Sequence, residues 1–210
     1  LFIFFILTTI TNTKLSYDFY KIKKFNIIGL DENEISKLYG DFEIFKDKNI
    51  FLFDKKDISE AIESFKIVEA FRINKIYPST LNIEIKKTKF LASVKINGID
   101  YLIGANGNLI EDQNEILELP FVFGNIKVDN FLNFKKIIDK SKFEYDSIKK
   151  LYYFKSNRWD IVFKDGLVLK MPTNLTIKKL NLIFEIVNKK NFKSIKSFDF
   201  RQKNMLIINE

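Results

Sequence analysis

Between Asn157 and Pro172, apolar and polar positions alternate in a pattern that predicts two paired strands. The apolar row of the first strand is Trp159, Ile161 and Phe163, and that of the second is Leu167, Leu169 and Met171. A two-residue loop at Asp165-Gly166 would put the two rows on opposite faces. A three-residue loop, Lys164-Asp165-Gly166 with Gly166 at positive φ, puts both rows on one face. We therefore predict a hairpin with a three-residue turn.

Residues 24–91 have the pattern of a strand, two helices and then two strands. Asp31 and Glu34 form a capping box before the first helix, and Asp57 is the predicted cap of the second. The apolar stripe of the second helix consists of Ile58, Ala61, Ile62 and Phe65. The segments Val68–Ile76 and Thr80–Lys86 alternate as the two arms of a hairpin.

Residues 92–210 contain many short strand patterns and two helical ones. The helices are predicted at about Phe131–Ser141 and Leu175–Lys189, and the last strands at Ile195–Arg201 and Met205–Asn209. The expected fold class is therefore α+β, with a mostly antiparallel second domain.

The segment Leu1–Ile10 is almost wholly apolar and carries no charge. It is too short to cross a bilayer, which needs about 20 residues, so we expect residues 1–12 to be the outer half of a truncated membrane anchor. A buried strand or the core of a signal peptide is the alternative. Residues 13–23 are the expected linker, and the absence of a second apolar run places the remaining chain on one side of the membrane.

The composition offers little for catalysis. The chain has no cysteine and no histidine, so thiolate nucleophiles, the usual general base and the usual transition-metal ligands are absent. No phosphate-binding glycine motif and no spaced carboxylate motif occurs in it. We expect a protein that is not an enzyme and that binds no cofactor and no small-molecule substrate.

The net charge of +8 raises the alternative of a nucleic-acid binder. Of the 35 basic residues, only Arg72, Arg158 and Arg201 are arginines, and arginine is the preferred bidentate partner of phosphate and guanine. The lysines are interspersed with acidic residues. Both observations argue against nucleic acid as a partner.

The C-terminal segment Met205–Ile208 is an apolar run with no charge before Glu210. As an exposed edge strand it would be a template for another chain, whereas as a covered strand it would only complete the core. Asp199 and Arg201 share a strand face, so they form either an ion pair or part of a partner-facing surface. Trp159 is predicted to lie in the core, with an interface anchor as the alternative.

Several stretches resemble the FtsQ (DivIB) family of bacterial cell-division proteins. They are G-L-D-E-N-E-I from Gly29, N-I-F-L-F-D from Asn49, V-E-A-F-R-I-N-K-I-Y-P from Val68, L-P-F-V-F-G from Leu119 and F-D-F-R from Phe198. The resemblance implies a POTRA domain at 24–91 and a β domain at 92–210. It also implies a single-pass inner-membrane protein whose bulk lies in the periplasm at the division septum.

The same resemblance implies a scaffold that links FtsB and FtsL to earlier division proteins. FtsB would bind the C-terminal edge of the β domain by strand addition. The implied partner-binding residues are Ser197, Asp199, Arg201, Met205, Leu206, Ile207 and Ile208. A POTRA-type chaperone or secretion module that binds extended polypeptide remains an alternative.

Overall fold

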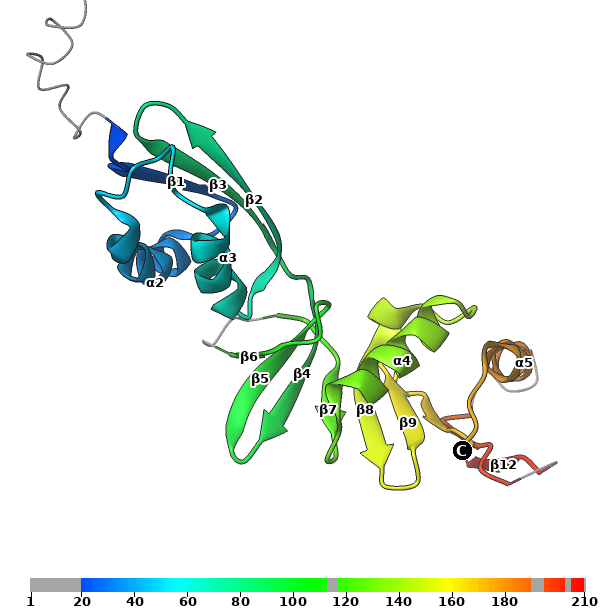
Figure 1. Ribbon diagram of the computed structural model, residues 1–210. Helices are drawn as coiled ribbons and strands as arrows, with labels where there is room; N and C mark the ends of the chain where they lie inside the picture. Colours follow the sequence, from blue (N-terminus) through cyan, green and yellow to red (C-terminus); the bar gives the residue numbers. More distant parts are fainter. Residues whose placement is uncertain (1–19, 113–116, 190–194, 203–204, 210) are drawn as a thin grey trace, which may run out of the picture. The chain divides into compact units, whose positions relative to one another are not determined.

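The computed structural model describes residues 20–112, 117–189, 195–202 and 205–209 (Figure 1). The chain divides into two compact units, of which the first ends at Thr88 and the second begins at Lys89. Each unit has its own hydrophobic core, and each is described by itself.

Unit 1 has the predicted order of strand, two helices and two strands. Its elements are β1 (Lys24–Ile28), α2 (Glu32–Phe42), the 3-10 helix η2 (Glu43–Phe45), α3 (Lys55–Ser64), β2 (Val68–Ile76) and β3 (Thr80–Lys87). The sheet order is β1-β3-β2, with β1 parallel and β2 antiparallel to β3. Leu38 and Phe42 of α2 and Ile58 and Ile62 of α3 share one buried cluster with the alternating strand residues Leu81, Ile83 and Ile85. Both helices therefore cover the same face of this sheet.

The helix caps of unit 1 include one correction. The Asp31 carboxylate accepts a bond from the backbone N–H of Glu34, and the Glu34 carboxylate accepts one from that of Asp31, as the capping box predicts. The prediction of Asp57 as the cap of α3 was wrong. The N-cap is Asp54, whose Oδ1 accepts from the Lys56 N–H at 3.0 Å. Asp57 lies in the first turn of α3, where its negative charge interacts favourably with the positive end of the helix dipole.

Unit 2 is built on one nine-stranded sheet in the order β12-β11-β10-β9-β8-β7-β4-β5-β6. Its strands are β4 (Phe90–Ile96), β5 (Ile99–Gly104), β6 (Leu109–Glu111), β7 (Phe121–Phe123), β8 (Ile148–Phe154), β9 (Arg158–Phe163), β10 (Val168–Lys170), β11 (Ser197–Asp199) and β12 (Ile207–Asn209). The helices are α4 (Val128–Asp139), the 3-10 helix η3 (Tyr145–Ser147) and α5 (Ile177–Val187). The predicted α+β class, with a mostly antiparallel second domain, is confirmed.

Several boundaries in unit 2 differ from the prediction. Helix α4 begins at Val128 rather than Phe131, since its N-cap, Lys127, makes no side-chain capping bond that would mark the start in the sequence. The last two strands are shorter than predicted. Strand β7 lies parallel between β4 and β8, and these two non-local pairings have no local sequence signal.

The predicted hairpin of β9 and β10 is confirmed together with its register. Ile161 pairs with Leu169, and the Gly166 N–H donates to the Phe163 carbonyl at 3.1 Å, which closes a turn over residues 164–166. Gly166 has a φ of 94°, as the three-residue turn requires. The inward row of β9 lies in the core together with residues of α4 and α5.

The expected anchor at residues 1–12 and most of the expected linker at 13–23 lie outside the described residues. Among residues 20–209, leaving out the gaps given above, no helix has the length and apolar character needed to cross a membrane.

Candidate partner-binding edge

Among the strands that the structure describes, β12 is the outermost of the unit 2 sheet and pairs only with β11. Its pairing is antiparallel, with Asn209 opposite Ser197, Ile208 opposite Phe198 and Ile207 opposite Asp199. The outward N–H and C=O groups of such a strand have no neighbouring strand to bond in the described part of the sheet. This edge is therefore a template on which a further strand can form.

The side chains of this edge are apolar and accessible. The exposed fractions are 59% for Met205, 37% for Leu206, 42% for Ile207 and 43% for Ile208. These values exclude the alternative that Met205–Ile208 is a covered core strand. Because successive strand residues face opposite ways, Ile207 and Ile208 present one apolar side chain on each face of the sheet.

Strand β11 fixes the position of this edge. Phe198 is only 1% exposed and belongs to the core of unit 2. The neighbouring strand β10 pairs with β11 in parallel, with Leu169 opposite Phe198. The pairing with β10 therefore fixes the position of β11 relative to the β9–β10 hairpin. The pairing with β11 fixes the position of β12 in turn.

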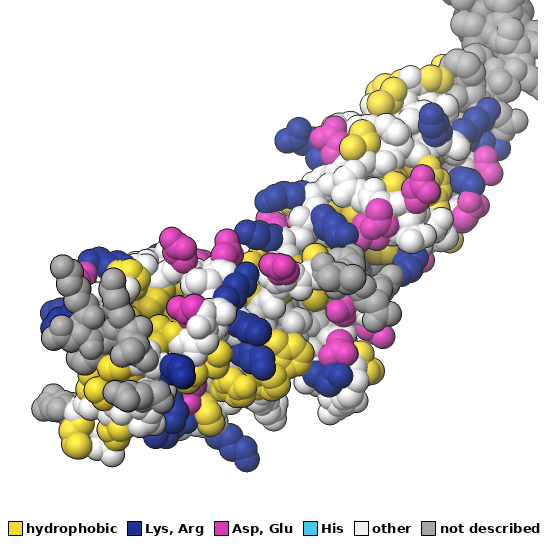
Figure 2. All heavy atoms as spheres, turned by 180° about the vertical axis from the view of Figure 1, so that it is seen from behind, with side chains coloured by type: hydrophobic (Ala, Val, Ile, Leu, Met, Phe, Trp, Pro, Cys, Tyr) yellow, Lys and Arg dark blue, Asp and Glu magenta, His cyan; other side chains and the backbone are white. Residues whose placement is uncertain are grey.

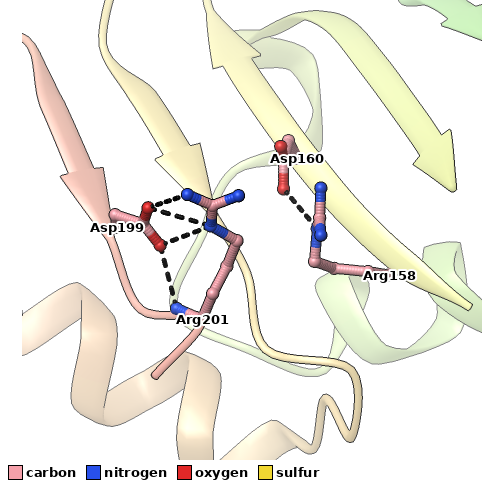
Figure 3. Close-up of polar contacts among 4 residues, drawn as sticks. All are labelled: Arg158, Asp160, Asp199 and Arg201. Carbon is pink, nitrogen blue, oxygen red and sulfur yellow. Dashed lines mark hydrogen bonds and ion pairs between the residues drawn. The ribbon is translucent and has the colours of Figure 1, made fainter. Parts of the chain in front are cut away.

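Asp199 and Arg201 form a close ion pair at the end of β11 (Figure 3). The Arg201 Nε lies 2.8 Å from both carboxylate oxygens of Asp199, and the Arg201 backbone N–H donates to Oδ1 at 3.0 Å. The hydrogen bonds from the Arg201 guanidinium lower the pKa of Asp199, with further help from the Arg201 backbone N–H. The pair secures the turn of the chain as it leaves β11. The predicted ion pair is confirmed, and a role of the two residues in a partner-facing surface stays a prediction.

A second ion pair on β9 was not anticipated from the sequence. Asp160 is only 8% exposed, and its Oδ1 lies 3.3 Å from the Nε of Arg158 (Figure 3). Burial raises the pKa of Asp160, and the nearby Arg158 charge opposes this shift without cancelling it. Asp160 is opposite Lys170, and Lys170 is opposite Asp199. The alternating charges thus form a row across three strands that ends beside β12. In the sequence, Asp160 was marked only by its position between Trp159 and Ile161, which places it on the face of β9 opposite the predicted core row.

Trp159 is a core residue rather than part of this edge. It is 6% exposed, and its ring stacks on Phe134 with centroids 4.4 Å apart.

The same sheet also carries an aromatic surface that was not predicted from the sequence. There Phe123 stacks on Tyr152 at 4.7 Å, and the Arg158 guanidinium lies 3.9 Å from the centre of the Phe154 ring. Figure 2 shows hydrophobic side chains gathered on unit 2, with lysine and arginine side chains around them.

The seven predicted partner-binding residues lie on β11, on β12 or on the connection between them. The structure brings Ser197, Asp199 and Ile207 together through the β11–β12 pairing. It leaves Met205 and Leu206 exposed just before β12. Whether these residues bind a partner stays a prediction.

Two family models match the chain, and between them they cover both units. The model of the FtsQ-type POTRA domain matches residues 20–87. The model of the C-terminal domain of cell division protein FtsQ/DivIB matches residues 92–201, which is more than half of the chain. The chain belongs to the FtsQ/DivIB family. This FtsQ/DivIB protein is therefore a scaffold protein of bacterial cell division, and the family is found at the membrane of the division site.

Comparison with solved structures and with curated proteins adds little to this FtsQ/DivIB assignment. One similar structure is the major extracytoplasmic domain of the trans isomer of the cell-division protein DivIB from Geobacillus stearothermophilus. It has 13% sequence identity and a TM-score of 0.36, and the match covers 51% of this chain and 98% of that one. No curated protein matches the chain. In this FtsQ/DivIB protein the match to the C-terminal model ends at Arg201, so β12 lies beyond it.

Proposed function

We propose that this FtsQ/DivIB protein is a non-enzymatic scaffold whose β12 edge captures an extended segment of FtsB by strand addition. FtsL would join the assembly through FtsB. The observation that carries the proposal is the position of β12: it is the last strand of the sheet, with four exposed apolar residues at or just before it.

Strand addition suits this edge for two physical reasons. A strand laid beside β12 would bond to its outward backbone groups, which supplies affinity without regard to sequence. The alternating side chains of that strand would then lie beside Ile207 on one face and Ile208 on the other, which supplies selectivity. The charged row that ends at Asp199 lies only on the face of Ile207, so the two faces would select different side chains.

The ionisable groups next to the edge fit a structural role rather than a catalytic one. The carboxylates of Asp160 and Asp199 both accept from arginine side chains on their own strands or at their ends. In the described ranges no three metal-ligating side chains come together. Each of these ion pairs forms within one strand or at its end, so it fixes the local conformation of that strand.

The proposed topology is a single pass through the inner membrane, with residues 1–12 forming part of the anchor. Residues 24–91 and 92–210 would then lie in the periplasm as the POTRA and β domains. The POTRA domain would contact earlier division proteins at the septum. Support for this arrangement comes from the apolar segment Leu1–Ile10 and from the absence of a second such run in the sequence.

A charge placed on β12 tests the proposal. Ile207→Lys puts a cation at the edge, where natural proteins place lysine to prevent strand pairing. We expect this variant to lose capture of an immobilised FtsB segment by about tenfold or more, which corresponds to roughly 1.4 kcal/mol. Ile208→Pro removes a backbone N–H and should abolish capture as well.

Leu182→Lys is the matched control, because Leu182 is 61% exposed on α5 and the change in charge is the same. Its capture should equal that of the unchanged chain. Capture of the FtsB segment by the folded Ile207→Lys variant at full strength would refute the edge as its binding site. Equal capture of unrelated extended peptides by the unchanged chain would instead favour the chaperone or secretion alternative.

A further inference from the structure

One end of unit 1 carries a cluster of exposed aromatic and aliphatic side chains, which we call the aromatic tip. It consists of the half-buried Tyr20 and the exposed Phe51, Leu52, Ile76 and Tyr77. The exposed fractions are 54% for Phe51, 85% for Leu52, 50% for Ile76 and 55% for Tyr77. Such large apolar side chains are normally scattered when they lie on a surface, whereas these are adjacent.

Contacts between three chain segments hold the aromatic tip together. The rings of Phe51 and Tyr77 stack with centroids 4.6 Å apart, and the ring of Tyr20 meets Phe51 edge-on at 5.1 Å. The Ile50 N–H donates to the Tyr20 carbonyl at 2.8 Å. The tip is thus a defined surface of the folded unit rather than a set of unconnected side chains.

Two exposed lysines lie near the aromatic tip. Lys23 and Lys24 are exposed at the start of β1, and both of their backbone N–H groups donate to the Ser79 carbonyl in the turn that carries Tyr77. Lys48, in the neighbouring loop, points away from the tip: its ammonium group lies 4.9 Å from the centre of the Phe45 ring and 3.9 Å from an Asp57 oxygen. Figure 2 shows hydrophobic side chains at this end of unit 1, with both basic and acidic side chains close by.

The aromatic tip lies where the described chain begins, and only residues 11–19 separate Tyr20 from the apolar segment Leu1–Ile10. The stretch from Ile10 to Tyr20 spans at most about 36 Å even when fully extended. If Leu1–Ile10 is anchored in the membrane, Tyr20 is therefore held within that distance of the bilayer surface. The proposal that follows rests on this anchor.

We propose that the aromatic tip docks onto the surface of the membrane that holds the anchor. Tyrosine and other aromatic side chains are favoured at the level of the lipid headgroups, with their apolar part in the bilayer boundary. The neighbouring Lys23 and Lys24 side chains are attracted to anionic lipid headgroups. Docking fixes which end of unit 1 faces the bilayer, a function separate from the capture of a partner at β12.

The absence of cysteine from the chain allows a direct test. Leu52→Cys places a single thiol on the tip, and Glu63→Cys places one on an exposed position near the C-terminal end of α3. Each variant of the chain, with its N-terminal segment, is labelled with an environment-sensitive fluorophore. The labelled chains are reconstituted into vesicles of phosphatidylcholine and phosphatidylglycerol, some containing brominated lipid, and the vesicle-bound fraction is isolated by flotation.

We expect brominated lipid to quench the Leu52 probe about twofold or more and the Glu63 probe hardly at all. Equal quenching at the two positions, or none at Leu52, would overturn the proposal. The second outcome would leave a protein partner as the occupant of the tip. Since capture of FtsB is measured in a separate assay, failure of the tip to dock is distinct from failure of the scaffold role.

A pair of apolar-to-polar substitutions keeps the test independent of folding defects. Phe51→Ser removes a ring from the tip, and Ile28→Ser is the matched control, because Ile28 is 52% exposed at the opposite end of β1. With the probe at Leu52, Phe51→Ser should reduce quenching about twofold, and Ile28→Ser should leave it unchanged. Circular dichroism verifies that both variants are folded, and equal quenching in the two folded variants would contradict the docking.

Discussion

Asp160 and Asp199 lie on the same face of the unit 2 sheet, two strands apart, yet their pKa values shift in opposite directions. Desolvation dominates at Asp160 and raises its pKa. Hydrogen bonds from Arg201 dominate at Asp199 and lower its pKa. The ionised form is therefore disfavoured by burial at the first residue and stabilised by its partner at the second.

This contrast predicts opposite pH dependences for two variants. A lowered native pKa makes the contribution of Asp199 fully present above its unfolded value near 3.8, and this contribution is lost as the pH falls through the native pKa. The stability gap between the unchanged chain and Asp199→Asn should thus narrow as the pH is lowered below about 4. For Asp160 the native pKa is raised, so acidification should favour the unchanged chain over Asp160→Asn. Denaturant unfolding at several pH values measures both gaps, and parallel changes in the two would contradict this account.

Trp159 sets the stability of the unit 2 core at the residue scale. Its ring stacks on Phe134 and lies 4.9 Å from the ring of Tyr153. Trp159→Ala should cost about 3–5 kcal/mol in the free energy of unfolding, because the cavity cannot be fully closed. Leu182→Ala, at a 61% exposed position, should cost less than about 0.5 kcal/mol. A small loss for Trp159→Ala, combined with loss of FtsB capture, would show that Trp159 is an interface residue.

At the scale of elements, Gly166 and Gly124 both have a positive φ, but they differ in the space around an added Cβ. A comparison of the two positions therefore distinguishes the cost of backbone strain from the cost of a steric clash. Gly166 has a φ of 94° in the β9–β10 turn, and an added Cβ would have no atom within 4 Å. Gly124 has a φ of 108° just after β7, and an added Cβ would lie 2.3 Å from the Tyr153 carbonyl oxygen on β8. The chain thus needs glycine at Gly124 both for conformation and for the close approach of β8.

Gly166→Ala should therefore cost about 1–2 kcal/mol from strain alone. Gly124→Ala should cost more, about 3 kcal/mol or more, since β7 and β8 must also move apart. Thermal or denaturant unfolding of the two variants gives the comparison. Equal losses of unfolding free energy in the two variants would contradict this, because they would show that β7 and β8 can move apart at no cost in stability.

Local sequence signals predicted the elements that depend on neighbouring residues. The capping box at Asp31, the turn at Gly166 and the core row of β9 are all set within a few residues of chain, and each is confirmed. The parallel pairing of β7 with β4 and β8 depends on contacts distant in sequence, so no local pattern marks it. The start of α4 was missed because Lys127 provides no capping side chain.

The sequence shows that Met205–Ile208 is apolar, but it does not show whether these side chains are exposed. An uncharged apolar run such as Met205–Ile208 is compatible with both an edge strand and a buried strand. The distinction depends on whether another strand lies outside β12, which is a property of the whole sheet. Asp160 was missed for a similar reason, because its burial follows from its place among neighbouring strands.

At the scale of the whole molecule, the excess of 35 basic over 27 acidic residues gives the net charge of +8 without marking a nucleic-acid site. Most of the ion pairs in the described chain join lysine to a nearby carboxylate. Strand addition depends mainly on backbone bonds and apolar contact, so salt should affect it little.

The FtsB segment should therefore bind about equally well, within roughly twofold, at 50 and 200 mM salt. A protein that neutralises six or more phosphates would lose roughly a thousandfold in affinity for nucleic acid over the same range. Titration by fluorescence anisotropy with the FtsB segment and with a single-stranded oligonucleotide distinguishes the two. Tight, steeply salt-dependent binding of the oligonucleotide would support the nucleic-acid alternative.

The central claim is that an extended partner strand pairs with β12. Amide hydrogen exchange tests it directly, because it measures whether the backbone N–H groups of β12 become hydrogen-bonded. Exchange is compared in the chain alone and in its complex with the FtsB segment. Within Ile207–Asn209 we predict slower exchange in the complex for those β12 amides that point away from β11, because these N–H groups become bonded to the partner. Exchange in α5 should not change. A complex that forms at full affinity while the β12 amides exchange as fast as in the free chain would contradict the claim.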